Sequence, residues 1–211
     1  MEICLLRHGE TDWNLQGRCQ GVTDLNLNET GIRQATGVGE LLSKEKIDAV
    51  YSSNLKRATQ TARAISKHHG LEVRVRSDLR ELDHGIFEGL TFKEIHANYP
   101  EFIGTWREQP AHLPVPGGEC IADVEKRTWK GIEEIGRSHP PFASVVVVSH
   151  QFPIVTVLCR ITETPLNDYR RFHVDPSGLT RISYLPHEGW KLIRHNDLSH
   201  IRAADSEESL P

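Results

Sequence analysis

The stretch Ile3-Cys4-Leu5-Leu6-Arg7-His8-Gly9-Glu10 decides how this chain folds. Four consecutive apolar residues are typical of a strand that is buried on both faces, and the charged residues and glycine after Leu6 mark its end. The run Val145-Val146-Val147-Val148 has the same character, and Ala49-Val50-Tyr51 is a shorter example. Because segments with helical spacing separate these runs, the sequence predicts a single α/β domain with a mostly parallel central sheet and helices on both faces.

The helical segments show apolar residues that recur every three to four positions. They predict helices over about 32–42, with Asn28 or Thr30 as N-cap, over 55–65 and 119–136, and from about Pro153. A polar loop is expected up to about residue 29, and Pro100 interrupts shorter helical pieces within 91–108. A further strand is expected at 73–75, a loop over 109–118, and an edge hairpin from 179–185 and 190–194. We expect one domain over residues 1–202 and a flexible, polar tail over 203–211.

The composition excludes several classes of function. The chain has 211 residues with 25 Lys+Arg and 29 Asp+Glu, so its net charge of −4 lacks the basic surplus of a nucleic-acid-binding protein. Its longest apolar run is far shorter than the roughly 20 residues of a membrane span, and no signal peptide is visible. The four cysteines are scattered, which favours a reducing compartment and predicts a cytoplasmic protein. None of the twelve histidines has HxH or HExxH spacing, so no metal site is expected.

The residues that follow the predicted strands are the candidates for a functional site, because ligands bind at the carboxyl ends of parallel strands. Arg7 and His8 follow the first strand, Arg57 lies one turn beyond the second, and His150 follows the valine run. Glu81 comes after the third strand. A neutral imidazole is a nucleophile toward phosphorus, arginine binds phosphate oxygens, and a carboxyl group exchanges protons with a leaving group or water. Such a set transfers phosphoryl groups without a metal or another cofactor.

Five blocks of sequence resemble the histidine phosphatase superfamily, which includes the cofactor-dependent phosphoglycerate mutases. They occur in the family's order over residues 3 to at least 160, which makes the resemblance specific. The blocks are Leu6-Arg7-His8-Gly9-Glu10-Thr11 with Trp13-Asn14, then Asp24 to Ala35, Ser52 to Ala62, Glu81 to Gly89 with Pro116-Gly117-Gly118-Glu119, and Val148-Ser149-His150.

The resemblance implies a role for each matching residue. His8 would be the nucleophile that becomes phosphohistidine, and Arg7, Arg57 and His150 would bind the transferred phosphoryl group. Glu81 would protonate the leaving alcohol and then activate water. Substrate-binding positions would be Asn14, Gln20, Gly21, His84 and Gln151.

Two of these assignments have alternatives. Glu88 lies close to Glu81 and is a second candidate for the acid, although the spacing to Gly85 favours Glu81. His84 flanks the acid and is expected either to face the leaving group or to be an ordinary loop residue.

The activity implied by the resemblance is hydrolysis of small phosphorylated metabolites. Mutases of the family usually carry extra sequence between the acid motif and the second histidine, which helps to close the site. Here only 36 residues separate Glu81 from Gly117, and a short, open pocket admits water to the phosphohistidine. Features typical of phosphoserine phosphatases, α-ribazole phosphatases and fructose-2,6-bisphosphatase domains occur together, so the substrate is left open. A phosphoglycerate mutase and an inactive module that binds phosphorylated ligands are the alternatives. Dimers occur in this family, but no sequence feature identifies a homodimer interface.

Overall fold

A computed structural model describes residues 1–201 of the chain, so the tail expected over 203–211 lies outside the described residues. Its elements, in chain order, are β1 (Glu2–Arg7), α1 (Asp12–Leu15), α2 (Glu29–Leu42), β2 (Ala49–Ser53), α3 (Lys56–Ser66), β3 (Val73–Arg76), η1 (Ser77–Leu79), η2 (Gly85–Phe87), α4 (Phe92–Asn98), α5 (Pro100–Glu108), α6 (Ile121–Arg137), β4 (Ser144–Ser149), α7 (Gln151–Ile161), η3 (Leu166–Arg171), β5 (Leu179–Leu185) and β6 (Gly189–Asp197).

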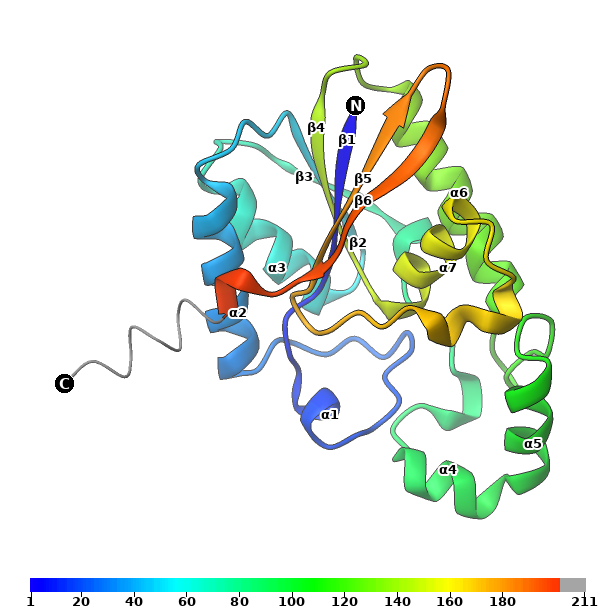
Figure 1. Ribbon diagram of the computed structural model, residues 1–211. Coiled ribbons are helices and arrows are strands. Elements are labelled where there is room, and N and C mark those ends of the chain that lie inside the picture. The colour runs from blue at the N-terminus through cyan, green and yellow to red at the C-terminus, as the bar shows by residue number, and fades with distance from the viewer. Residues whose placement is uncertain (202–211) are drawn as a thin grey trace.

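The strands form one six-stranded sheet in the order β3-β2-β4-β1-β5-β6. The β1–β4, β4–β2 and β2–β3 pairs are parallel, and β5 and β6 form the expected antiparallel hairpin at one edge. In Figure 1, α2 and α3 cover one face of the sheet, and α6 and α7 cover the other. The mostly parallel α/β sheet with helices on both faces is therefore confirmed.

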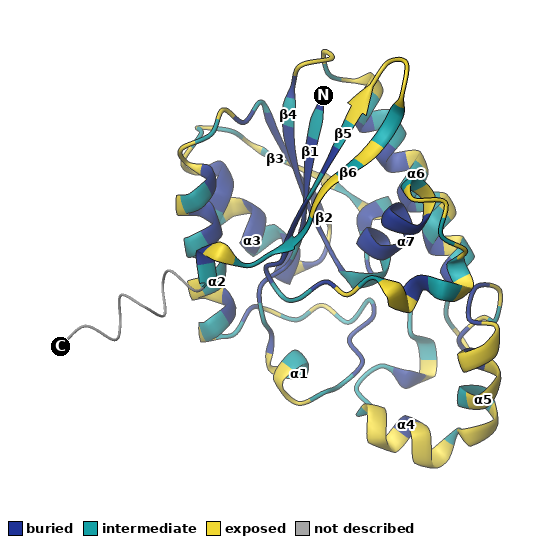
Figure 2. Ribbon diagram, viewed as in Figure 1, coloured by how far each residue is buried: buried dark blue, intermediate teal, exposed yellow. Residues whose placement is uncertain are grey.

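The alternation of side chains along the inner strands divides the core in two. Leu5 and Val147 belong to the core beneath α6 and α7, whereas Leu6 and Val148 belong to the core beneath α2 and α3. All four are at most 1% exposed, which explains why these strands read as continuous apolar runs rather than as alternating ones. Figure 2 shows the buried strands at the centre of the molecule.

The predicted loop between the first strand and the first long helix contains a short helix, α1, and the expectation of a continuous loop was wrong here. Thr11 caps this helix, because its hydroxyl accepts a hydrogen bond from the backbone of Asn14 and its own backbone N–H donates to the Asn14 side chain. Asn28, rather than Thr30, caps α2 by accepting from the N–H of Gly31. Pro100 lies at the first position of α5 and separates it from α4, as expected.

Helices α4 and α5 extend from the side of the sheet at which the parallel strands end (Figure 1). Much of their surface is exposed (Figure 2), while Ile95 and Trp106 are buried against the rest of the molecule. Among residues 1–201, no helix has the length and apolar character needed to cross a membrane.

The loop after β1 packs tightly against the start of α2. A Cβ atom on Gly9 would lie 2.5 Å from the carbonyl oxygen of Gly31, a distance that excludes any side chain. Glycine at this position therefore lets the chain beyond His8 lie directly against the helix.

Candidate active site

Two histidines meet at the carboxyl ends of neighbouring parallel strands. His8 follows β1 and His150 follows β4, and their ring centroids are 5.0 Å apart. His8 is 2% exposed and His150 is fully buried. The register between the two strands pairs Arg7 with Ser149, so the backbone pairing itself places the two rings side by side.

The protonation state of His8 follows from its hydrogen bonds. Its Nδ1 atom lies 2.7 Å from the carbonyl oxygen of Gly9, which can accept a hydrogen bond but cannot donate one. Its Nε2 atom lies 3.3 Å from Nε of Arg57, which can only donate. Burial, followed by the charges of Arg57 and Arg7, holds the pKa of His8 well below its usual value. His8 is therefore a neutral imidazole with its proton on Nδ1 and its lone pair on Nε2.

His150 is held in the complementary tautomer. Its Nε2 atom lies 2.8 Å from the hydroxyl of Ser53, whose oxygen also accepts from the N–H of Leu55. Within residues 1–201 the Ser53 hydroxyl hydrogen has no other acceptor, so we assign it to Nε2 and place the imidazole proton on Nδ1. That Nδ1 atom is buried and has no partner among the described residues. Burial, followed by the charge of Arg57, keeps the pKa of His150 well below its usual value.

The arginines are anchored differently. Arg57 is fully buried and donates to the carbonyls of Thr23 (2.8 Å) and Gly21 (2.7 Å) as well as to His8. Arg7 donates through Nη1 to the carbonyl of Val174 (2.6 Å) and to Oε1 of Gln151 (2.8 Å). The Nε atom of Arg7 is buried without a partner in the described part of the chain. Burial lowers the pKa of Arg7 and lowers that of Arg57 to about 10, so Arg57 keeps its charge at neutral pH.

Glu81 and Glu88 occupy different environments. Glu81 lines the cavity, and its carboxylate accepts from the backbone N–H groups of Leu82 (2.8 Å), Gln151 (3.1 Å) and Phe152 (3.1 Å). The last two N–H groups belong to the first turn of α7, directly after His150. Glu88 instead accepts from the backbone of Val22 and Thr23 and does not line the cavity. The geometry therefore favours Glu81 as the carboxyl group beside the histidines.

Arg127 of α6 fixes the segment that carries Glu81. It donates to the backbone carbonyls of Asp78 (2.8 Å), Arg80 (2.6 Å) and Glu81 (2.8 Å) and forms an ion pair with Glu119 (3.0 Å). Sequence reasoning missed Arg127, because its position on the helix has no motif that distinguishes it from a solvated arginine.

A cavity of about 700 Å³ opens beside these groups. It brings together nine of the ten site residues expected from the sequence: Arg7, His8, Asn14, Gln20, Gly21, Arg57, Glu81, His84 and Gln151. His150 is not among the residues that line the cavity, and its ring centroid lies 5.0 Å from that of His8. The Gln151 side chain is held by Arg7, and the ring of His84 lies edge-on to Phe152 at 5.6 Å.

The rest of the cavity wall is largely aromatic, and the sequence did not indicate this. Phe102 and Trp106 come from α5, Phe152 from α7 and Tyr169 from η3. These residues are far apart in the chain and have no common spacing, so no periodic pattern could have linked them.

Among residues 1–201, no group of three or more histidine, cysteine or acidic side chains lies close enough to hold a metal ion. All four cysteines are buried and unpaired. The charged groups beside His8 that could act on an anion are therefore the two arginines.

Paired histidines, two arginines and a carboxylate at the strand ends of an α/β sheet define a phosphoryl-transfer site. The family described as the histidine phosphatase superfamily (branch 1) matches residues 3–198, and the chain belongs to this family. It is a phosphatase that works through a phosphohistidine intermediate, as the sequence predicted. Its substrates are small phosphorylated compounds.

Three relatives illustrate the similarity. Phosphoserine phosphatase 1 of Hydrogenobacter thermophilus is 37% identical over 182 residues, which are 86% of each chain. The metal-independent phosphoserine phosphatase of Arabidopsis thaliana is 34% identical, covering 95% of this chain and 83% of its own. Among solved structures, the mycobacterial glucosyl-3-phosphoglycerate phosphatase in complex with VO3 has a TM-score of 0.85 and 32% identity, covering 92% of this chain and 98% of its own.

Proposed function

We propose that this chain hydrolyses phosphomonoesters of small metabolites by transferring the phosphoryl group to Nε2 of His8. The observation that carries this proposal is the pair of hydrogen-bond partners of His8, from which we assign its tautomer. The carbonyl of Gly9 keeps the ring proton on Nδ1, and burial beside Arg57 disfavours a second proton. Nε2 therefore carries no proton at neutral pH. Its lone pair accepts from Nε of Arg57 at 3.3 Å, and we propose that it turns to phosphorus when Arg57 donates to the phosphoryl oxygens instead.

The proposed reaction has two displacements. In the first, Nε2 of His8 forms a bond to phosphorus while the ester P–O bond breaks, and the leaving oxygen takes a proton from the Glu81 carboxyl group. In the second, Glu81 takes a proton from water, the water oxygen bonds to phosphorus, and the P–N bond breaks. Inorganic phosphate leaves and His8 is regenerated. Arg7 and Arg57 supply fixed positive charge for the phosphoryl oxygens. We propose that the Nδ1–H of His150, which is buried without a partner beside His8 among the described residues, becomes a further donor once the phosphoryl group is bound, and that no metal ion is needed.

Asn14, Gln20, Gly21, His84 and Gln151 are proposed to contact the substrate, since all five line the cavity. His84 is the residue of this group nearest in sequence to Glu81, and we place it beside the leaving group. Phosphoserine, α-ribazole phosphate and fructose 2,6-bisphosphate are all candidate substrates, so the test includes these compounds.

The test is a phosphate-release screen with the wild type and His8→Ala. It covers sugar phosphates, phosphoserine, phosphoglycerates and nucleotides, each with and without EDTA and vanadate. We expect turnover that vanadate inhibits and EDTA leaves unchanged, and we expect His8→Ala to abolish it. His68→Ala, which changes an exposed histidine at the end of α3, is the matched control and should retain full activity.

The outcomes separate the alternatives. Activity that EDTA removes would contradict the proposed chemistry. Interconversion of 3- and 2-phosphoglycerate with little release of phosphate would identify a mutase. Binding of phosphorylated ligands without turnover by the wild type would identify an inactive binding module. An acid-labile, base-stable phosphoprotein, trapped by rapid quenching and absent in His8→Ala, would support the intermediate at His8.

We further propose that the protein acts in the cytoplasm and has neither a nucleic-acid nor a membrane partner. The support is its net charge of −4 and its four unpaired cysteines, which suit a reducing compartment. A homodimer is left open, and sedimentation of the purified protein would determine the oligomeric state. Recovery of the protein in a membrane or nucleic-acid fraction of a cell lysate would contradict the proposal.

A further inference from the structure

The cavity carries more positive charge than the phosphoryl group requires. Five arginines line it, whereas Glu81 is its single lining carboxylate within the described chain. Arg7 and Arg57 lie beside His8, and Arg18 is paired with Glu94 at 3.8 Å. Arg107 and Arg170 form no ion pair with any residue in the range 1–201. Two exposed guanidinium groups on the cavity wall are thus without a counter-charge from this part of the protein.

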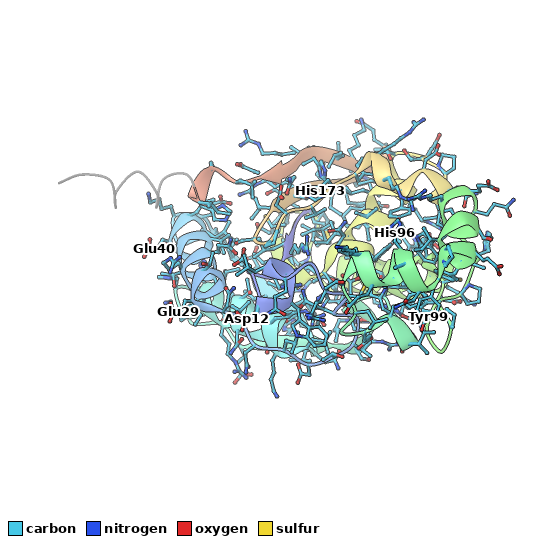
Figure 3. The ribbon with its side chains drawn as sticks, turned by 90° about the horizontal axis from the view of Figure 1, so that it is seen from below. Asp12, Glu29, Glu40, His96, Tyr99 and His173 are labelled. Atoms are coloured by element: carbon cyan, nitrogen blue, oxygen red, sulfur yellow. The ribbon has the colours of Figure 1, made fainter. Side chains whose placement is uncertain are left out.

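Arg107 of α5 and Arg170 of η3 belong to two elements that a buried hydrogen bond connects. Trp106 of α5 donates through its indole N–H to the hydroxyl of Tyr169 of η3 at 3.3 Å, and Arg107 and Arg170 are the next residues in each element. The Arg170 guanidinium lies 4.7 Å from the centre of the Tyr169 ring. Nη2 of Arg107 lies 3.5 Å from Nδ1 of His96, an exposed residue on the side of the molecule seen in Figure 3. Both arginines therefore belong to the outer part of the cavity, on the α4, α5 and η3 side.

The cavity also has an apolar, aromatic lining. Phe102, Trp106 and Phe152 contribute rings to it, and Trp106 and Phe102 stack at 5.6 Å. A cavity of about 700 Å³ is within the range that holds a drug-sized molecule, and it is much larger than a three-carbon phosphate ester. The wall therefore suits an apolar body rather than the polar skeleton of phosphoserine.

We propose that the preferred substrate is a phosphate ester of an alcohol with a ring-sized apolar body and an acidic group at the far end. The phosphoryl group is bound beside His8, the apolar body lies against the aromatic wall, and the acidic group is bound by Arg107 and Arg170. The inference rests on the proposed function, because it assumes that the phosphoryl group enters beside His8.

The test uses two esters that differ in one charge. They are 4-(phosphonooxymethyl)phenylacetate and its primary amide. The alcohols that leave from these two esters have the same carbon skeleton and nearly the same size. The wild type should hydrolyse the acid with a kcat/KM roughly 10- to 100-fold above that of the amide, as expected for charge-assisted hydrogen bonds to guanidinium. Phosphoserine should be hydrolysed with a kcat/KM at least about 10-fold below that of the acid, since it leaves the aromatic wall unfilled.

The variants Arg107→Gln, Arg170→Gln and the double variant show whether these side chains cause the preference. The ratio of acid to amide should fall in each single variant and approach one in the double variant. A ratio within one protein cancels any general loss of activity or of folded enzyme. Arg63→Gln, at an exposed arginine of α3 that does not line the cavity, should keep the wild-type ratio.

Equal kcat/KM values for acid and amide in the wild type would overturn this inference and leave the proposed function intact. So would a ratio that the double variant preserves, or a preference for phosphoserine over the aromatic acid. Failure of the wild type to release phosphate from any ester in the wider screen would instead refute the proposed function, and this inference with it.

Discussion

Replacing Ser53 by alanine tests the proposed site most directly, because the Ser53 hydroxyl sets the tautomer of His150 and through it affects catalysis. In Ser53→Ala, the fully buried Nε2 of His150 loses its donor at 2.8 Å, and the imidazole proton is no longer directed to Nδ1. Nε2 then competes for the proton, so the donor available to the phosphoryl oxygens is partly lost. Complete removal of one such donor costs about 10²–10³ in kcat, and we expect a 10- to 100-fold decrease for this partial loss.

Stability should change as well. Ser53→Ala also leaves the N–H of Leu55 without its side-chain acceptor, and a buried polar group without a partner costs about 1–3 kcal/mol. The matched control is Ser52→Ala. Ser52 is equally buried, but its hydroxyl donates to the backbone carbonyl of Ser53 and does not contact a histidine. We expect the control to lose stability, measured by urea unfolding, while its kcat changes less than threefold.

The direct measurement is the ¹⁵N spectrum of the histidine rings in labelled protein. The wild type and Ser52→Ala should show His150 with the proton on Nδ1, and Ser53→Ala should show a shift toward the Nε2-protonated form. The reasoning would be refuted by a wild-type spectrum with the proton on Nε2. It would also be refuted if Ser53→Ala kept the wild-type tautomer and a kcat within twofold of the wild type.

Three other predictions follow from the same geometry. Because the pKa values of His8 and His150 are lowered, the folded protein binds fewer protons than the unfolded chain below pH 6.5. The free energy of unfolding in urea should therefore hold above pH 6.5 and decrease below it, by up to about 1.4 kcal/mol per pH unit for each histidine. Equal stability at pH 7 and pH 5 would contradict this. Arg127→Met should lower kcat about 10- to 100-fold, since it frees the backbone of Glu81. It should also destabilise the protein by about 3–5 kcal/mol, because part of the charge of Glu119 is left unpaired. An unchanged kcat in the folded variant would argue against a positioning role for Arg127. Gly9→Ala should lower the free energy of unfolding by about 1–3 kcal/mol, because its Cβ would overlap Gly31. Gly104→Ala in α5, where the space is open, should instead raise the free energy of unfolding by about 1 kcal/mol. Equal melting temperatures of the two variants would contradict this packing.

The parts of the fold that the sequence predicted are those where burial leaves a periodic signal. Continuous apolar runs such as 145–148 are typical of strands buried on both faces, and such strands favour parallel pairing with helices on each side. The helix α1 gave no such signal, because it is four residues long and has no buried residue. Its capping box, Thr11 and Asn14, was visible in the sequence, but the short loop around it offered no apolar stripe to support a helix.

The candidate site was predictable where it adjoins strand ends, because topology alone brings those positions together. His8 and His150 are far apart in the chain, but they lie side by side because they follow paired strands. The protonation pattern was not predictable, since it depends on which atoms of Gly9 and Ser53 approach the rings. The aromatic wall was also missed, because Phe102, Phe152 and Tyr169 converge only through the packing of α5, α7 and η3.

The reacting groups and the aromatic wall come from different parts of the chain, and this has a consequence for how specificity can change. His8, Arg57 and Glu81 follow sheet strands, whereas Phe102, Trp106 and Arg107 lie on α5, within an excursion of the chain between residues 92 and 108. That excursion is bounded by loops and has a largely exposed surface. Natural variation or directed evolution confined to these residues can therefore redirect the enzyme to a new leaving group without rebuilding its chemistry.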